Sequence, residues 1–151
     1  MMTRICFRTK LNRSIIGFVI LTIIATLFSG CAPPNVNKEA VEREVIGFHY
    51  QLDSEEYSAL YEHADADLKK ATSQDDFEKL LRAVHKKLGH VLSANPAGSV
   101  VTAGTNGTYV QSTYETTFVE GKGIEQFVWR MRDDRLSLYG YTINSNELIT
   151  K

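Results

Sequence analysis

The chain has 151 residues, with 17 Lys and Arg, 18 Asp and Glu, and two cysteines. This length fits one ordinary domain, and the balance lacks the basic surplus that nucleic-acid-binding proteins usually show. The sequence contains no Gly-rich phosphate loop, no HExxH zinc motif and no nucleophile elbow. The commonest sequence signatures of nucleotide hydrolases, zinc proteases and α/β-hydrolases are therefore absent.

The first 30 residues have the pattern of an export signal. An apolar stretch over residues 14–28 follows four basic residues, namely Arg4, Arg8, Lys10 and Arg13. A membrane-spanning helix needs about 20 apolar residues, whereas a signal-peptide core needs about 7–15, so the length favours a signal peptide. All 18 acidic residues lie after this segment, together with 13 of the 17 basic residues, so the remainder of the chain is acidic.

The segment "LFSGC" at residues 27–31 resembles a bacterial lipobox. The resemblance implies diacylglycerol on the Cys31 sulfur, cleavage between Gly30 and Cys31, further acylation of the new amino group, and residence in the cell envelope. Ala32 stands where envelope sorting often reads an aspartate, so a host with two membranes would place the protein on the outer membrane, facing the periplasm. An uncleaved anchor helix and a chance cysteine are the alternatives.

Lipid attachment would leave the mature chain without a free thiol. Cys6 would leave with the signal peptide and Cys31 would be acylated, which excludes cysteine nucleophiles and cysteine-based zinc sites. Two or more acyl chains give stable membrane anchoring, whereas one gives only marginal binding. We therefore divide the chain into a signal peptide (1–30), a tether (31–38) and a single domain (39–151).

The first part of the domain has the spacing of helices. Val41, Val45, Phe48 and Leu52 recur at helical intervals and predict a helix over residues 38–52. Ser54 is expected to cap a second helix. The third helix begins after Ser73 and ends at Gly89, with an apolar face made by Phe77, Leu80, Leu81, Val84 and Leu88.

From residue 90 the apolar period changes to two, which is typical of strands. Strands are predicted over residues 90–95, 99–104, 108–120, 124–132 and 135–143, with a type I′ turn at Asn106-Gly107 and turns at residues 121–123 and 133–134. Gly140 is expected to mark a bulge. The fold class is α+β, with the helices packed on one face of a curled antiparallel sheet.

This order of elements resembles the cystatin-like, nuclear-transport-factor-like cone. More narrowly, "YVQSTYETTF", "GIEQFVW", "LYGYTI" and the helix end in "KKLGHVL" resemble domain of unknown function 4019, a family of exported bacterial proteins. The resemblance covers about residues 41–149 and implies the cone architecture. It implies no known chemistry.

The titratable side chains do not converge on a recognisable site. His49 is interpreted as a core histidine, "HADAD" (residues 63–67) as a solvated turn, and His85 and His90 as residues that face water at a helix end. Glu115 and Glu125 are expected to pair across strands with Arg130 or Arg132. The sequence therefore predicts no catalytic residue, no metal site and no cofactor.

Aromatic residues are abundant on the strands, where alternation places Phe127 and Trp129 on one face and Tyr139 and Tyr141 on one face of the next strand. They are interpreted mainly as core. Tyr114, Trp129 and Tyr141 are the candidate ligand contacts, because tyrosine and tryptophan suit a pocket wall that is apolar with one polar group. We expect a non-catalytic binding module or an envelope assembly module with a protein partner. A small cone-fold enzyme and a small-ligand-binding protein with a pocket between helices and sheet are the alternatives.

Overall fold

The structure, a computed structural model, describes residues 36–150. The predictions for the signal peptide, for Cys31 and for most of the tether lie outside the described residues. Residues 36–150 belong to one compact unit. Within residues 36–150, no helix is both long enough and apolar enough to cross a membrane.

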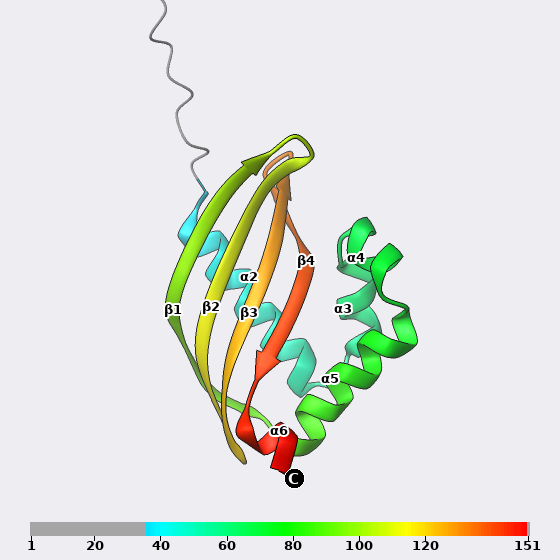
Figure 1. Ribbon diagram of the computed structural model, residues 1–151, viewed down its shortest axis with the longest axis vertical. Coiled ribbons are helices and arrows are strands. Elements are labelled where there is room, and N and C mark those ends of the chain that lie inside the picture. The colour runs from blue at the N-terminus through cyan, green and yellow to red at the C-terminus, as the bar shows by residue number, and fades with distance from the viewer. Residues whose placement is uncertain (1–35, 151) are drawn as a thin grey trace, which may run out of the picture. The chain divides into compact units, whose positions relative to one another are not determined.

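Within residues 36–150, four helices precede four strands, and one short helix follows them (Figure 1). The elements are α2 (Lys38–Asp53), α3 (Tyr57–His63), α4 (Ala66–Ala71), α5 (Gln74–Leu88), β1 (Val91–Gly104), β2 (Gly107–Phe118), β3 (Gly121–Arg132), β4 (Arg135–Asn144) and α6 (Asn146–Thr150). The strands form one antiparallel sheet in the order β1-β2-β3-β4. This confirms the α+β class and the order of helices before a curled meander.

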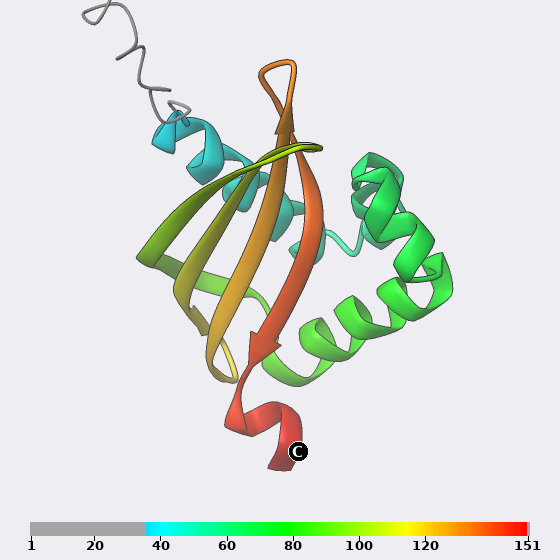
Figure 2. The ribbon, with the colours of Figure 1, turned by 45° about the horizontal axis from the view of Figure 1, so that its top comes forward.

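The curled sheet packs against α2, while α3, α4 and α5 lie beside β4 (Figures 1 and 2). Phe48 of α2 makes the central contact, with its ring centroid 5.1 Å from that of Phe127 and 4.8 Å from that of Tyr141. Alternate residues of β2 and β3 are buried, as the period of two requires. Trp129 and Leu81 both belong to this core.

The sequence predicted the longest helices closely. In α5 the Ser73 hydroxyl accepts a hydrogen bond from the Asp76 backbone N–H at 3.2 Å. Gly89 ends the helix with a φ of 76°, a left-handed conformation that glycine adopts without a Cβ clash. Helix α2 extends one residue beyond the predicted range, to Asp53.

The prediction for the second helix was wrong at its start. Ser54 ends α2, since its backbone N–H donates to carbonyls of that helix, and α3 begins only at Tyr57. Glu55 between them has a φ of 59°, which turns the chain. Helix α4 was not predicted; its first turn is capped by Asp65 through a 2.8 Å hydrogen bond from the Asp67 backbone N–H.

Two turns and one strand also differ from the prediction. The strands predicted over residues 90–95 and 99–104 are one strand, β1, which continues through Pro96 with a register shift between Pro96 and Gly98. Proline is tolerated there because β1 lies at the edge of the sheet. The β1–β2 turn is centred on Thr105-Asn106, because Gly104 pairs with Gly107, and the β2–β3 turn is centred on residues 119–120.

The left-handed pair that a type I′ turn requires occurs instead at Asp133 and Asp134, with φ values of 48° and 59°. The register between β3 and β4 shifts where Val128 pairs with Gly140 and Trp129 pairs with Leu138. The bulge expected at Gly140 is therefore confirmed. Tyr139 is the extra residue and is 37% exposed, so the prediction that it shares a face with Tyr141 was wrong.

Candidate functional site

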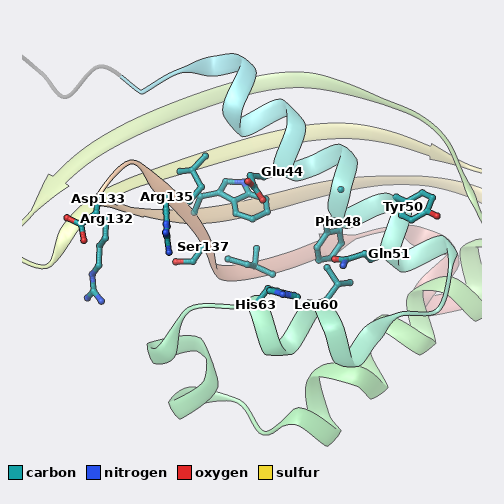
Figure 3. A pocket seen from close by; sticks show the side chains of 14 residues that line it. Glu44, Phe48, Tyr50, Gln51, Leu60, His63, Arg132, Asp133, Arg135 and Ser137 are labelled. Atoms are coloured by element: carbon teal, nitrogen blue, oxygen red, sulfur yellow. The ribbon is translucent and has the colours of Figure 1, made fainter.

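A cleft of about 1040 Å³ lies between α2, α3 and the β3–β4 hairpin (Figure 3). Its apolar wall is made by Phe48 of α2, Leu60 of α3, Trp129 of β3, and Leu136 and Leu138 of β4. This volume is slightly above the range of about 300–1,000 Å³ that is typical of small-ligand sites. The cleft is the place between helices and sheet where a ligand of moderate size fits.

The rim of this cleft is polar and carries both charges. Figure 3 shows Glu44 on α2 and His63 on α3, with Arg132, Asp133 and Arg135 on the hairpin at one end. The Nδ1 of His63 donates to the Ala59 carbonyl at 2.8 Å, since a carbonyl only accepts. The Nε2 of His63 therefore remains available to a ligand.

Trp129 carries a hydrogen-bond donor without a partner. Its side chain is 3% exposed, and its Nε1 is one of two buried side-chain nitrogen or oxygen atoms in the described part of the chain that lack a hydrogen bond. A buried donor without a partner costs about 1–3 kcal/mol.

A second polar cluster is buried behind the cleft, where α2 meets the sheet. Glu125 is fully buried, and its carboxylate accepts from the Tyr141 hydroxyl at 2.7 Å and from the Thr116 hydroxyl. The Nε2 of His49 lies 2.8 Å from the same carboxylate. Burial first, and then the charge of Glu125 and its hydrogen bond, raise the pKa of Tyr141 well above its ordinary value, so the hydroxyl stays a donor.

His49, Glu125 and Tyr141 do not line the cleft. Each oxygen of Glu125 already accepts at least one hydrogen bond from within the core, so the group is arranged as a structural anchor between α2 and β3. The interpretation of His49 as a core histidine with a partner is confirmed. The expected pairing of Glu125 with an arginine was wrong.

Arg130 is the other buried charge of β3, with 1% exposure. Its guanidinium donates two hydrogen bonds to the Asp65 carboxylate and one, at 2.6 Å, to Asp67. The "HADAD" segment is therefore an ion-pair site against the edge of β4, where the Asp65 backbone N–H also donates to the Leu138 carbonyl at 2.8 Å. The interpretation of this segment as a solvated turn was wrong.

The ion pairs shift the acidities of both aspartates. Burial raises the pKa of Asp65, but the hydrogen bonds from Arg130 and from the Asp67 backbone outweigh it and leave that pKa below its ordinary value. The hydrogen bond from Lys70, followed by that from Arg130, lowers the pKa of Asp67 to about 2. Burial lowers the pKa of Arg130, but the hydrogen bonds to Asp65 and Asp67 outweigh it and raise that pKa above its ordinary value, so Arg130 stays charged.

The three candidate ligand contacts lie in different places. Trp129 lines the large cleft, whereas Tyr114 lines a hollow of about 500 Å³ between the start of α2 and strands β1 and β2. Tyr141 lies in the core, where its hydroxyl is bonded to Glu125. The structure does not bring the three side chains into one pocket.

Sequence reasoning missed most of the cleft, because its residues come from three separate parts of the chain. One signal for the cleft was present in the sequence, namely "RDDR" (residues 132–135), which lies close to Trp129 in the chain. This segment forms the tip of the β3–β4 hairpin and carries charges of both signs. His85 and His90 were expected to face water. Only His90 does so, with 64% of its side chain exposed, whereas that of His85 is 14% exposed.

These features define a small α+β domain with helices on a curled antiparallel sheet and a cleft beside its last hairpin. The chain belongs to the family described as protein of unknown function (DUF4019), whose model matches residues 48–141. The matched segment runs from Phe48 in α2 to Tyr141 in β4, so it includes the apolar wall of the cleft and both buried charges. The predicted resemblance is thereby confirmed. No curated protein matches the chain.

Proposed function

We propose that this protein is a lipid-anchored protein of the cell envelope whose domain binds a small, partly apolar ligand without catalysing a reaction. The observation that carries the proposal is the cleft of about 1040 Å³, where Trp129 presents an apolar ring and its N–H is without a partner. Tryptophan is well suited to such a wall, because it combines a large apolar surface with one donor.

The distribution of polar groups favours binding over catalysis. The buried pair of His49 and Glu125 is separated from the cleft and saturated with hydrogen bonds. The rim groups carry opposite charges, so they favour a neutral or zwitterionic ligand over a multiply charged one. The ligand class that fits is a small molecule with an apolar body that packs against the Trp129 ring.

The anchor in this proposal is diacylglycerol on Cys31, supported by the lipobox-like "LFSGC" segment and the short apolar stretch before it. An anchor at this position would confine the domain to the surface of the membrane. The outer membrane, facing the periplasm, is the proposed location in a host with two membranes.

The single tryptophan of the chain makes the binding claim directly testable. A library of small organic molecules is screened by NMR against the ¹⁵N-labelled protein, and the indole N–H resonance of Trp129 is followed. We expect a set of binders that shift this resonance, since the Trp129 ring lines the cleft.

Gly47→Leu supplies the blocking variant. Gly47 lines the cleft, and a Cβ added there meets no atom within 4 Å, so the leucine side chain enters the cleft without distorting the helix. Arg43→Leu, on the same helix but outside the cleft, is the matched control. Binders that are lost with Gly47→Leu and kept with Arg43→Leu support the proposal. A library without any binder, or binders indifferent to Gly47→Leu, would overturn it.

A second candidate function is assembly with a protein partner, favoured by the free edge of β1. This strand lies at one end of the sheet, and Leu92, Val100 and Val101 are exposed on it. Exposed apolar residues on an edge strand invite pairing with another chain. Cross-linking from position 100 in intact cells, compared with position 126 on the interior strand β3, tests this candidate.

A further inference from the structure

Three residues with metal-binding side chains meet where α2 ends, where α5 ends and where β1 begins. They are Asp53, the last residue of α2, His85 in the last turn of α5, and His90 immediately before β1. One nitrogen of each histidine and one carboxylate oxygen of Asp53 all lie within 4.8 Å of one another. None of the three lines the large cleft. We propose that they bind one divalent transition-metal ion of the zinc class.

The donor set selects the class of ion. Two imidazoles and a carboxylate suit Zn²⁺ and the neighbouring first-row metals, whereas Mg²⁺ and Ca²⁺ are held mainly by oxygen atoms. No cysteine is needed, which agrees with a mature chain whose only cysteine would be acylated. No metal site was predicted from the sequence, because the three residues come close to one another only in the folded domain and form no short sequence motif.

The distances fit a site that closes when the ion binds. Metal–ligand bonds of about 2.0–2.2 Å at tetrahedral angles place neighbouring ligand atoms about 3.4 Å apart. The Nδ1 of His90 already lies 3.6 Å from the Oδ1 of Asp53. The rings of His85 and His90 have centroids 5.0 Å apart. The His90 side chain is 64% exposed, so it has room to rotate towards the other two ligands.

The backbone around the site is held in place without the ion. Both carboxylate oxygens of Asp53 accept from the Val91 backbone N–H, at 3.1 and 3.2 Å. The His90 carbonyl accepts from the Val119 backbone N–H at 3.0 Å. Gly89, with its left-handed φ, turns the chain out of α5 so that His90 returns beside Asp53. Only side chains therefore need to move.

Two further groups surround His85. The Tyr57 hydroxyl lies 3.2 Å from its Nδ1, and a carboxylate oxygen of Glu55 lies 3.9 Å from the same atom. A hydrogen-bonded group such as the Tyr57 hydroxyl orients a metal-bound histidine and is worth about 10–100-fold in affinity. Glu55 and Asp53 also add negative charge that attracts a cation. A bound ion would join α2, α5 and β1 at one point.

The test uses the full-length chain, purified in detergent without a metal-binding tag. Zn²⁺ is titrated in competition with a chromophoric chelator, and Co²⁺ is titrated to read the coordination from its visible d–d bands. We expect one equivalent of each ion to bind, with the Co²⁺ spectrum of a four- or five-coordinate site. Mg²⁺ should not compete. The thermal unfolding midpoint should rise with Zn²⁺, because an ion that binds the folded state stabilises it.

The variants distinguish this site from nonspecific metal binding by surface histidines. His90→Gln removes a ligand on an exposed side chain and should lower Zn²⁺ affinity at least about tenfold, while Glu55→Gln should lower it by a smaller factor. His63→Gln removes an exposed histidine elsewhere and should leave the affinity unchanged. No binding of Zn²⁺ or Co²⁺, unchanged affinity in His90→Gln, or an equal loss in His63→Gln would overturn the proposal. In those cases Asp53 and His90 form only a surface ion pair.

Discussion

Removing the carboxylate of Glu125 should destabilise the domain strongly. Glu125 is fully buried and serves three partners, the hydroxyls of Tyr141 and Thr116 and the ring nitrogen of His49. The three partners are between 1% and 8% exposed, so water would not replace the lost acceptor without entering the core. Each buried group left without a partner costs about 1–3 kcal/mol. Because hydroxyls can redirect their hydrogen atoms, Glu125→Ala should cost about 3–5 kcal/mol in total.

Glu125→Gln should cost less, about 1–2 kcal/mol, because it keeps the shape and one acceptor oxygen. Its amide can still accept from Tyr141, and its NH₂ group can donate to Thr116 or to a neutral His49. The assay is urea unfolding of residues 35–151, which contain all of the core residues in the described part of the chain. Glu115→Ala, at an exposed position of β2, is the control and should change stability by less than about 0.5 kcal/mol. A cost of Glu125→Ala below about 1 kcal/mol would refute the reasoning.

Three further predictions concern the core, the buried ion pair and the lipid anchor. Leu81→Ala and Trp129→Ala should each cost about 2–5 kcal/mol in urea unfolding, and a loss below about 0.5 kcal/mol would show that the side chain is not buried. The pKa values of Asp65 and Asp67 are lowered in the folded domain, so their contribution to its stability is complete above the unfolded-state pKa of about 3.9 and is lost as the pH falls towards about 2. Arg130→Gln should flatten this acid dependence of stability, as measured by pH-jump unfolding. Cys31→Ser should leave an unprocessed precursor without label from a clickable palmitate analogue, and normal labelling would contradict the lipid anchor.

The sequence predicted those elements whose signals are local. Helix α5 has an apolar period, a capping serine and a terminal glycine within 17 residues, and all three signals agree. The β3–β4 turn was found because two aspartates interrupt two strands. Helix α4 was missed because it has only 6 residues, too few for a period to be visible. Its N-cap, Asp65, was present in the sequence but was interpreted as part of a solvated turn.

The partners of the buried charges could not be predicted, because they depend on docking between distant segments. His49 and Glu125 are 76 residues apart, and Asp65 and Arg130 are 65 apart. A cross-strand pairing of Arg130 with Glu125 or Glu115 was reasonable from spacing alone. The register places Arg130 opposite Tyr109 and Ser137 instead, so no acid stands directly across from its charge on either neighbouring strand. The carboxylates that pair with Arg130 therefore come from the helical half of the chain, namely from Asp65 and Asp67.

The same two contacts explain how the helices are fixed on the sheet. Apolar packing between α2 and the sheet is not directional, and it would tolerate small shifts of the helix along the strands. Each buried charge of β3 is matched to one partner segment, Glu125 to α2 and Arg130 to the start of α4. A shifted helix would leave a buried charge unpaired, which is strongly unfavourable.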